Sequence, residues 1–347
     1  MKIIHCADIH LGSPMDSLPK EIAKERKADL RSSFEKMVKY ARDNGISVIL
    51  LSGDVFDGTK PPREELKFFY GVVKSAPDVD FLYLRGNHDM AGEPLEFPNL
   101  KTFSESWTTY SYGDVTVSGI ELNGGNTETY YSALSLDRNM KNIVMLHGQI
   151  GDDINLTRLK DKYIDYLALG HIHYYNADRL DSRGSYAYSG CLEGRGFDET
   201  GIKGFVILDT DGAGISHEFH PFSGAIIEKH SIDITNLDSA FDVYQRVNNT
   251  VNPRDNGIYR IILTGEVTHM DAELEAQVKG YLTRSCNGHF SVKNETRLRI
   301  NYEDYANDIS LRGEFIRTVQ ASTEYTEEEK ALIINYGLKA LTGEELV

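Results

Sequence analysis

Five short polar motifs occur in order along the first half of this sequence, and their side chains are carboxylates, imidazoles and one amide. The motifs are Asp8-Ile9-His10, Gly53-Asp54, Gly86-Asn87-His88-Asp89, His147-Gly148 and Gly170-His171-Ile172-His173. A shell of imidazole, carboxylate and amide oxygen suits manganese, iron or zinc better than magnesium or calcium. A lone Asp-X-His or Gly-Asp is a weak signal in a chain with 11 histidines, whereas Gly-His-Ile-His and above all Gly-Asn-His-Asp are stronger ones. The ordered set, however, favours a metal site.

Two divalent cations about 3.5 to 4 Å apart can clamp a phosphoryl group, supply a hydroxide near neutral pH and stabilise the leaving oxygen. One carboxylate must bridge such a pair, and Asp54 is the candidate. No motif contains a cysteine, which argues against a thiolate-rich structural zinc site. The chain's cysteines, Cys6, Cys191 and Cys286, form no metal-binding or disulfide pattern. The motifs therefore predict phosphoester hydrolysis by two metals.

Each motif follows a short apolar stretch that predicts a buried strand. The stretches are 2–7, 47–52, 81–85, 142–146 and 166–169. Continuous apolar runs are typical of central strands that are covered on both faces. Ligands of open α/β sheets gather outside the carboxyl ends of the strands, so we expect the motif side chains to converge at one edge.

Helical spacing of apolar residues predicts a helix within 18–44, and Pro61-Pro62 predicts a second helix that continues to about Lys74. Strand, helix, strand, helix, strand is half of a doubly wound α/β domain. After His88 the composition favours strands, which we expect at 115–122, 185–192, 204–209 and 217–222.

The motif set resembles the calcineurin-like metallophosphoesterase superfamily and, within it, the SbcD-like branch of DNA double-strand-break repair nucleases. Further stretches carry the resemblance: Ala7-Asp8-Ile9-His10-Leu11-Gly12, Gly53-Asp54-Val55-Phe56-Asp57, Tyr188-Ser189-Gly190-Cys191-Leu192-Glu193 and Lys203-Gly204-Phe205. It covers about residues 1 to 225. The resemblance implies an α/β fold of two packed mixed β-sheets flanked by helices, a four-layer sandwich, with a smaller C-terminal α/β capping domain.

Roles follow from the resemblance by matching positions. One metal would be held by Asp8, His10, Asp54 and His173, and the other by Asp54, Asn87, His147 and His171. The ions would be two divalent metals, manganese first, with iron or zinc as alternatives. His88 would face the phosphate, to stabilise the transition state or protonate the leaving oxygen, while Asp89 would orient His88 or its loop. A hydroxide bridging the metals would attack phosphorus. Asp57 and Asp165 are interpreted as structural.

Three segments are expected: a metallophosphoesterase (nuclease) domain at 1–224, an α/β capping domain at 225–305, and a C-terminal helical segment at 306–347. Within the second segment we expect strands at 228–234, 257–267 and about 290–300, with helices at 237–249 and 271–284. In the resembled nucleases the capping domain lies beside the active site and helps to select DNA geometry. Lys293, Arg297 and Arg299 are candidate phosphate contacts, although alternating charges on a strand are more often a solvated face.

The C-terminal segment contains Thr326 and Glu329 at capping-box spacing, followed by an apolar stripe at helical spacing. The stripe consists of Ala331, Ile334, Leu338 and Leu341. Two interpretations stay open. The stripe could pack on the chain's own core, or it could receive another protein, because related nucleases use C-terminal helices to hold the coiled-coil base of an ATPase.

The composition, 347 residues with 40% hydrophobic and 26% charged, is that of a globular protein with a sizeable core. No apolar run predicts a membrane span, and a reducing cytoplasm is the expected location. The formal charge of −16 argues against strong autonomous DNA binding, which needs clustered Lys and Arg. Bound cations would, however, reverse the local field, and a partner could supply the affinity.

The main hypothesis is a metal-dependent DNA phosphodiesterase or exonuclease, the nuclease subunit of an SbcCD-like repair complex. Its expected partners are DNA and an SMC-type coiled-coil ATPase, and a second copy of the chain is a further candidate. The alternative is hydrolysis of a cyclic nucleotide or another small phosphodiester, which the acidic balance favours. A non-catalytic scaffold is the third hypothesis, and the intact ligand set counts against it.

Overall fold

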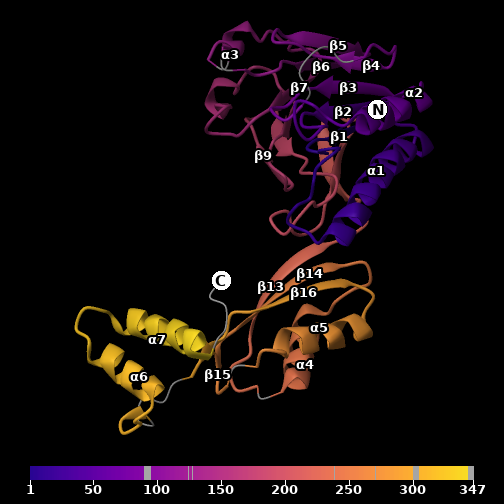
Figure 1. Ribbon diagram of the computed structural model, residues 1–347. Helices are drawn as coiled ribbons and strands as arrows, with labels where there is room; N and C mark the ends of the chain where they lie inside the picture. Colours follow the sequence, from indigo (N-terminus) through magenta and orange to yellow (C-terminus); the bar gives the residue numbers. More distant parts are fainter. Residues whose placement is uncertain are drawn as a thin grey trace. The chain divides into compact units, whose positions relative to one another are not determined.

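The computed structural model describes residues 1–89, 95–123, 125–126, 128–237, 239–269, 271–299 and 305–342 (Figure 1). The chain divides into two compact units, Met1–Glu228 and Lys229–Val347, and each is described by itself. Within the described ranges, no helix combines the length and apolar character that crossing a membrane requires.

The first sheet of the first unit is mixed, with strand order β12-β11-β1-β2-β3-β4. Its strands are β1 (Lys2–Cys6), β2 (Val48–Ser52), β3 (Asp80–Leu84), β4 (Leu100–Thr102), β11 (Gly204–Asp209) and β12 (Ser216–Pro221). Strands β1 to β4 pair in parallel, whereas β11 pairs antiparallel to β1 and β12 antiparallel to β11. The predicted strands at 2–7, 47–52 and 81–85 are therefore confirmed as neighbours.

The second sheet has strand order β5-β6-β7-β8-β10-β9. Its strands are β5 (Thr108–Tyr112), β6 (Val115–Gly119), β7 (Lys141–His147), β8 (Tyr166–Gly170), β9 (Asn176–Arg179) and β10 (Ser185–Tyr188). The central strands β6, β7, β8 and β10 pair in parallel, and the edge strands β5 and β9 pair antiparallel. The sequence patterns did not predict the edge strands β4, β5 and β9, which are short or largely polar.

The two sheets pack face to face through fully buried apolar side chains. The first sheet contributes Ile3, Leu50, Leu82 and Val206 to this core, and the second contributes Ile143, Met145, Tyr166 and Ala187. Apolar burial on both faces explains why these strands read as continuous apolar runs. The common core holds the carboxyl ends of β1, β2, β3, β7 and β8 at one edge.

Helices and turns cover the outer faces. Helices α1 (Lys20–Asp43) and α2 (Arg63–Ser75) pack on the first sheet, where Tyr40 contacts Phe205 and Phe69 contacts Tyr83. The short helix α3 (Tyr130–Ala133) and the 3₁₀ turn η1 (Leu156–Arg158) lie over the second sheet around Tyr130 and Leu146. The predicted class, two packed mixed sheets flanked by helices, is confirmed.

The second unit contains a three-stranded sheet of order β13-β14-β16. Its elements are β13 (Ile227–Asp233), α4 (Ala240–Val251), β14 (Ile258–Thr264), β15 (Glu266–Val267), α5 (Leu274–Ser285), β16 (His289–Asn294) and β17 (Arg297–Leu298). Helices α4 and α5 pack on the sheet through Val243, Val247 and Val278. The strand predicted at 257–267 is interrupted at Gly265, whose φ is +99°. The predicted strand end at Ile300 lies outside the described residues.

Helices α6 (Leu311–Ala321) and α7 (Glu327–Thr342) complete the second unit. The predicted capping box is confirmed, because Thr326 N donates to Glu329 Oε2 at 2.8 Å and Glu329 N donates to Thr326 Oγ1 at 3.3 Å. Ile334 and Leu338 of the apolar stripe are buried with Ile316 and Val319 of α6, and Leu341 is 45% exposed. Two of the four stripe residues therefore pack on the chain's own helix α6.

His5 is a buried titratable residue on β1, between the two sheets. Its ring is fully buried and its Nδ1 lies 2.9 Å from the Tyr166 hydroxyl. Burial lowers the pKa of His5 from 6.5 to about 3, so this imidazole is neutral in the folded protein. Between these two values the unfolded chain binds the additional proton, and stability is lost as the pH falls through this range.

We predict that acidification from pH 7 to pH 5 costs the wild-type first unit about 2 kcal/mol more than it costs a His5→Phe variant. Urea unfolding followed by the fluorescence of Trp107, the single tryptophan, measures this difference. Tyr166→Phe keeps His5 and should retain the wild-type pH dependence. Equal pH dependence in wild type and His5→Phe would contradict a neutral His5.

Candidate metal centre

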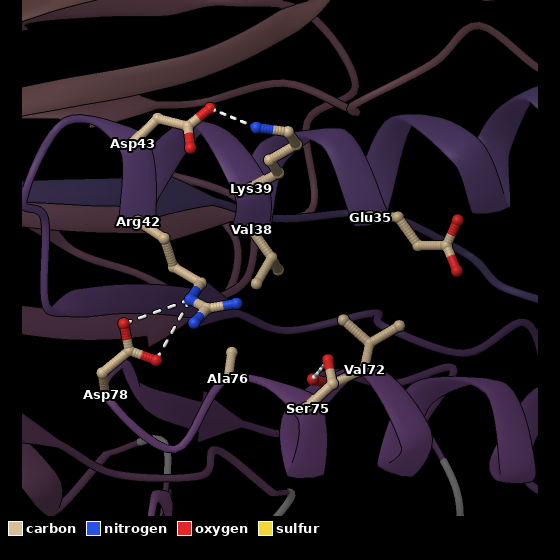
Figure 2. A pocket seen from close by; sticks show the side chains of 9 residues that line it. All are labelled: Glu35, Val38, Lys39, Arg42, Asp43, Val72, Ser75, Ala76 and Asp78. Carbon is tan, nitrogen blue, oxygen red and sulfur yellow. Dashed lines mark hydrogen bonds and ion pairs between the residues drawn. The ribbon is translucent and has the colours of Figure 1, made fainter.

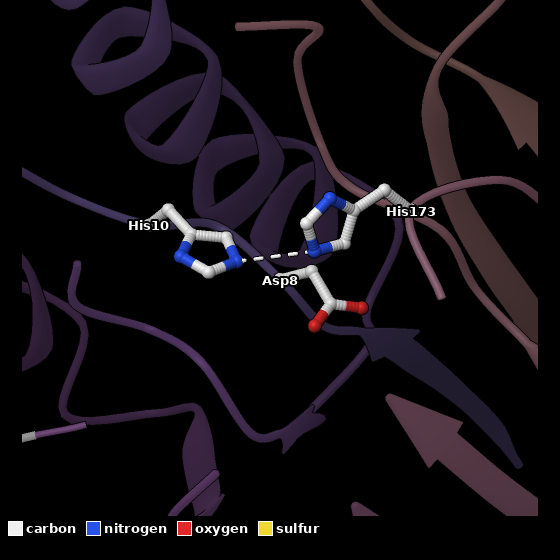
Figure 3. A group of neighbouring side chains, drawn as sticks. All are labelled: Asp8, His10 and His173. Atoms are coloured by element: carbon white, nitrogen blue, oxygen red, sulfur yellow. Dashed lines mark hydrogen bonds between the residues drawn. The ribbon is translucent and has the colours of Figure 1, made fainter. Parts of the chain in front are cut away.

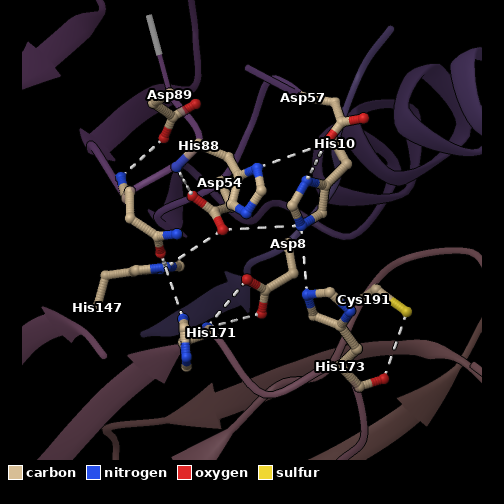
Figure 4. Close-up of polar contacts among 12 residues, drawn as sticks. Asp8, His10, Asp54, Asp57, His88, Asp89, His147, His171, His173 and Cys191 are labelled. Carbon is tan, nitrogen blue, oxygen red and sulfur yellow. Dashed lines mark hydrogen bonds and ion pairs between the residues drawn. The ribbon is translucent and has the colours of Figure 1, made fainter. Parts of the chain in front are cut away.

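The five motifs meet where the carboxyl ends of the central strands of both sheets come together (Figure 4). The first sheet supplies the loops after β1, β2 and β3, and the second supplies the end of β7 and the loop after β8. The structure brings all predicted ligands into this one cluster: Asp8, His10, Asp54, Asn87, His147, His171 and His173. The expectation that sequence-distant motifs converge is met.

Four of these residues have a backbone conformation that L-residues rarely adopt. The φ angles of Asp8, His10, Asp54 and His171 are +51°, +52°, +53° and +104°. Left-handed backbone costs about 1–2 kcal/mol per residue. Backbone hydrogen bonds between loops hold this conformation, with Asp8 N donating to Gly53 O at 3.0 Å and His10 N to Asp54 O at 2.9 Å. Strain of this kind concentrates at functional sites.

Two motif glycines allow the ligands to approach the backbone. A Cβ atom on Gly86 would lie 2.2 Å from Asp54 Oδ1 and 2.7 Å from His147 Nε2. A Cβ atom on Gly53 would lie 2.1 Å from His147 Nδ1, and the φ of Gly53 is +93°. Any larger residue at these two places would displace the side chains of Asp54 and His147.

The first group of potential ligands consists of Asp8, His10 and His173, whose ligand atoms lie within 4.8 Å of one another (Figure 3). His10 Nε2 and His173 Nε2 are only 3.3 Å apart. Each ring faces a carboxylate with its other nitrogen, so both Nε2 lone pairs point into the same space. Two neighbouring acceptors with no donor between them are what a bound cation requires.

The second group surrounds Asp54 and Asn87. Asp54 Oδ2 lies 3.3 Å from His147 Nε2 and 3.7 Å from His10 Nε2, so this oxygen faces ligands of both groups. Asn87 Oδ1 lies 3.0 Å from His147 Nε2 and 3.3 Å from His171 Nδ1. His171 N donates to both oxygens of Asp8, at 2.9 and 3.0 Å. The donor set fits two cations that share the Asp54 carboxylate.

Three of the imidazoles are oriented through the nitrogen that faces away from the ligand cluster. His10 Nδ1 lies 3.1 Å from Asp57 Oδ1, His173 Nδ1 lies 2.7 Å from Glu199 Oε1, and His147 Nδ1 donates to Ser52 O at 2.9 Å. Partners of this kind select the tautomer that presents Nε2 to a metal. Asp57, interpreted from the sequence as structural, therefore orients a predicted ligand.

Sequence analysis missed Glu199 and Arg195. Both belong to the loop after β10, and Arg195 Nε lies 3.1 Å from Glu199 Oε1. Neighbouring residues also support the backbone of His173, since Cys191 Sγ donates to His173 O at 3.3 Å and Lys203 Nζ donates to the same oxygen at 2.7 Å. Charged loop residues carry no distinguishing pattern, and only the flanking stretches Tyr188-Ser189-Gly190-Cys191-Leu192-Glu193 and Lys203-Gly204-Phe205 marked this region.

The pKa values of several carboxylates and imidazoles at the site are shifted, because these groups are buried and lie close together. Burial alone would raise the pKa of Asp54, but the hydrogen bond and positive charge of His147 hold it well below its usual range. Burial alone would lower the pKa of His147, yet Asp54 and Asp8 raise it to about 9. Burial raises the pKa of Asp8. A cation at His147 Nε2 would therefore compete with a proton.

The predicted catalytic residues occupy different environments. The His88 side chain is 51% exposed, its backbone N donates to Asp54 Oδ1 at 2.8 Å, and its Nδ1 lies 3.7 Å from Asp57 Oδ1. Asp89 is buried, and its two oxygens accept from Phe56 N and Gly86 N at 2.8 Å each. His88 is thus accessible to a substrate, whereas Asp89 joins the two motif loops.

The surface of the first unit is hollowed beside the ligand cluster and also between α1 and α2. The groove between the helices, lined by residues such as Val38, Val72 and Ala76, contains the ion pairs Lys39–Asp43 and Arg42–Asp78 (Figure 2). It contains none of the motif side chains. The other hollow, about 490 Å³, is bordered by Asn87, His147 and His171 together with Arg85, Gly86, Leu122, Asn123, Gly148 and Asp153. Of the two, this second hollow adjoins the ligand cluster.

Comparison with known proteins agrees with this geometry. The chain is 27% identical over 282 residues to the uncharacterized metallophosphoesterase YhaO of Bacillus subtilis, in an alignment that covers 72% of this chain and 67% of that protein. It is 28% identical over 242 residues to the DNA double-strand break repair protein Mre11 of Methanocaldococcus jannaschii, covering 61% of this chain and 63% of that protein. It is 30% identical over 102 residues to a subunit of the nuclease SbcCD of Rhodobacter capsulatus, covering 28% of this chain and 24% of that protein.

These alignments span about two thirds or less of each relative's length. Residues 1–175 match the family described as calcineurin-like phosphoesterase. The matched segment makes up half of the chain and contains all five motifs, from Asp8 to His173. By this match the chain belongs to the calcineurin-like phosphoesterase family.

Proposed function

We propose that this protein is a two-metal-dependent nuclease that hydrolyses phosphodiester bonds in DNA. The observation that carries the hydrolytic part is the position of Asp54 Oδ2, 3.3 Å from His147 Nε2 and 3.7 Å from His10 Nε2. One carboxylate lies between two sets of ligands, as a shared metal bridge requires. The relatives named as a double-strand break repair protein and a nuclease subunit support DNA as the substrate.

One cation would be held by Asp8, His10, Asp54 and His173, and the other by Asp54, Asn87, His147 and His171. When bound, two divalent cations, manganese first, would activate water and neutralise charge on the phosphoryl group. Asp8 and Asp54 are both buried, so the protein presents a low-dielectric, negatively charged recess that favours divalent cations.

His88 is the residue available for proton transfer. Its Nδ1 faces Asp57, which leaves Nε2 directed away from that carboxylate. From Nε2, His88 would donate to a phosphoryl oxygen or to the leaving oxygen. The bond from its backbone N to Asp54 Oδ1 ties its loop to the bridging carboxylate. Asp89 would act by holding the loop of Gly86 against the loop of Phe56.

The partner of this nuclease would be an SMC-type ATPase, in an SbcCD-like complex. The relative from Rhodobacter capsulatus is named as a subunit of such a nuclease. Helices α6 and α7 and the segment before α6 expose apolar side chains on the second unit, where Ile309, Leu311, Leu332 and Tyr336 are between 43% and 100% exposed. An ATPase partner would cover these side chains and contribute to DNA binding.

A small phosphodiester, such as a cyclic nucleotide, is the second candidate substrate. The hollow of about 490 Å³ beside Asn87, His147 and His171 favours it, because this space suits a nucleoside-sized group. The formal charge of −16 favours it too, since DNA binding normally uses clustered cations.

We predict that the purified protein with Mn²⁺ cleaves linear duplex DNA. Gel analysis of end-labelled DNA, beside the hydrolysis of a cyclic nucleotide by the same preparation, measures the preference. Hydrolysis of the cyclic nucleotide by a preparation that leaves the DNA intact would refute the nuclease proposal in favour of the second candidate.

His88→Ala should abolish turnover and leave metal occupancy unchanged, because His88 donates a proton but does not hold a cation. Removing a general acid typically lowers the rate about 10²–10⁴-fold. Turnover assays paired with elemental analysis of the purified variant measure both effects. His220→Ala, a histidine on β12 away from the motifs, serves as the control and should keep its turnover. Loss of both metals in His88→Ala would make His88 a ligand.

Asp54→Ala should empty both metal positions, because its carboxylate belongs to both ligand sets. Calorimetric titration with Mn²⁺ gives the stoichiometry. Asp165→Ala removes a carboxylate that is also buried but binds Arg183 and Asn142, and it should keep two ions. Retention of two tightly bound ions by Asp54→Ala would disprove the bridging role.

A further inference from the structure

The two ligand groups differ in the partners that their imidazoles contact through Nδ1. In the first group, His10 and His173 each face a carboxylate with Nδ1, Asp57 at 3.1 Å and Glu199 at 2.7 Å. In the second group, His147 Nδ1 faces a neutral carbonyl, that of Ser52, at 2.9 Å. His171 uses Nδ1 toward Asn87. Of the two groups, the first is therefore the one backed by two carboxylates, and Arg195 Nη2 lies 3.2 Å from His173 Nδ1 beside them.

A single guanidinium joins these two carboxylates. Arg195 Nη1 lies 3.7 Å from Asp57 Oδ1, and Arg195 Nε lies 3.1 and 3.2 Å from the two oxygens of Glu199. The side chains of Arg195, Asp57 and Glu199 are 15%, 18% and 4% exposed, so water screens their charges little. The planar fork of arginine holds a carboxylate in one orientation. Asp57, Arg195 and Glu199 are called the clamp below.

The loop that carries Arg195 and Glu199 is held in place by contacts with α1, in addition to its contacts with the ligands. Glu193, near the start of the same loop, is buried, and its Oε2 accepts from Arg26 Nη2 of α1 at 2.5 Å. Its Oε1 accepts from Ser33 Oγ at 2.6 Å and from Gly224 N at 2.7 Å. The buried pair of Glu193 and Arg26 anchors the loop to α1, and so fixes the place from which Arg195 and Glu199 reach the site.

We propose that the clamp makes the two metal positions unequal, with tighter binding at the position of His10 and His173, and that Arg195 is its central positioning residue. This inference rests on the proposed function. A carboxylate that accepts from Nδ1 holds the imidazole in the tautomer that binds metal through Nε2 and raises the basicity of that nitrogen. A carbonyl does so less strongly. Arg195 keeps Asp57 and Glu199 turned toward the imidazoles, which prevents them from binding the cation themselves.

Calorimetric titration of the full-length protein with Mn²⁺ tests the clamp. The wild type should show two binding events of unequal affinity. Glu199→Gln keeps the size and the acceptor oxygen but removes the charge, and should weaken the tighter event about 10- to 100-fold, the usual cost of losing such a partner. The weaker event should change less than about twofold. Asn87→Ala identifies the events, because it should remove the weaker one and spare the tighter one.

Arg195→Met should weaken the tighter event in the same direction as Glu199→Gln. Arg31→Met is the matched control, because Arg31 forms a two-point pair with Glu65 between α1 and α2 and belongs to neither ligand group nor the clamp. It should leave both events unchanged. Should Arg195→Met fail to fold, Glu199→Gln decides, since it keeps the size of the side chain.

Equal weakening of both events by Glu199→Gln, or no weakening of either, would overturn the clamp and leave the two-metal function standing. A wild-type protein that binds fewer than two Mn²⁺ ions would instead overturn the proposed function, and the clamp with it. The two failures are therefore told apart by the wild-type stoichiometry.

Discussion

The burial of negative charge at the junction of two sheets is the constraint on which the rest of the first unit depends. Asp8 and Asp54 are almost completely buried, and the nearest positive groups are imidazoles. Isolated carboxylates in such a place are very costly unless they are paired or bind cations. Every feature around them reduces that cost: the imidazoles converge on the same space, the glycines give room, and the loops are tied together by backbone hydrogen bonds.

The rigidity of the surrounding core is what allows the strained loops to persist. Left-handed backbone at Asp8, His10, Asp54 and His171 would relax in an unsupported loop. Here each strained residue closely follows a strand whose side chains are buried in packed layers. Hydrogen bonds to Asp89 from the loops of Phe56 and Gly86 add a further constraint. The core thus maintains the geometry of a site that would otherwise be unfavourable.

The strands that carry the motifs were predictable because their signal is local. Buried central strands are continuous apolar runs, and β1, β2, β3, β7 and β8 end within a few residues of the predicted positions. Edge strands have no such run: β9 consists of Asn176–Arg179, whose residues are largely exposed, and its pairing with β10 depends on a neighbour. The interruption at Gly265 was not predictable from hydrophobicity either, because β14 ends there through the backbone conformation of this glycine.

The sequence by itself determined which residue types stand at the strand ends, because strands and polar motifs are short-range patterns of apolar and polar residues. The two-sheet fold class and the division of the candidate ligands between two metals came from the resemblance of these motifs to a known family. Only the tertiary structure decided which side chains contact and orient the candidate ligands. Asp57, Arg195 and Glu199 lie in loops without periodicity. The roles of Asp57 and Glu199 depend on distances of 3.1 and 2.7 Å to His10 and His173, which lie in other segments of the chain. Arg195 lies 3.7 Å from Asp57, which also belongs to another segment of the chain. Such distances arise from the packing of two sheets and a helix, which no local pattern encodes.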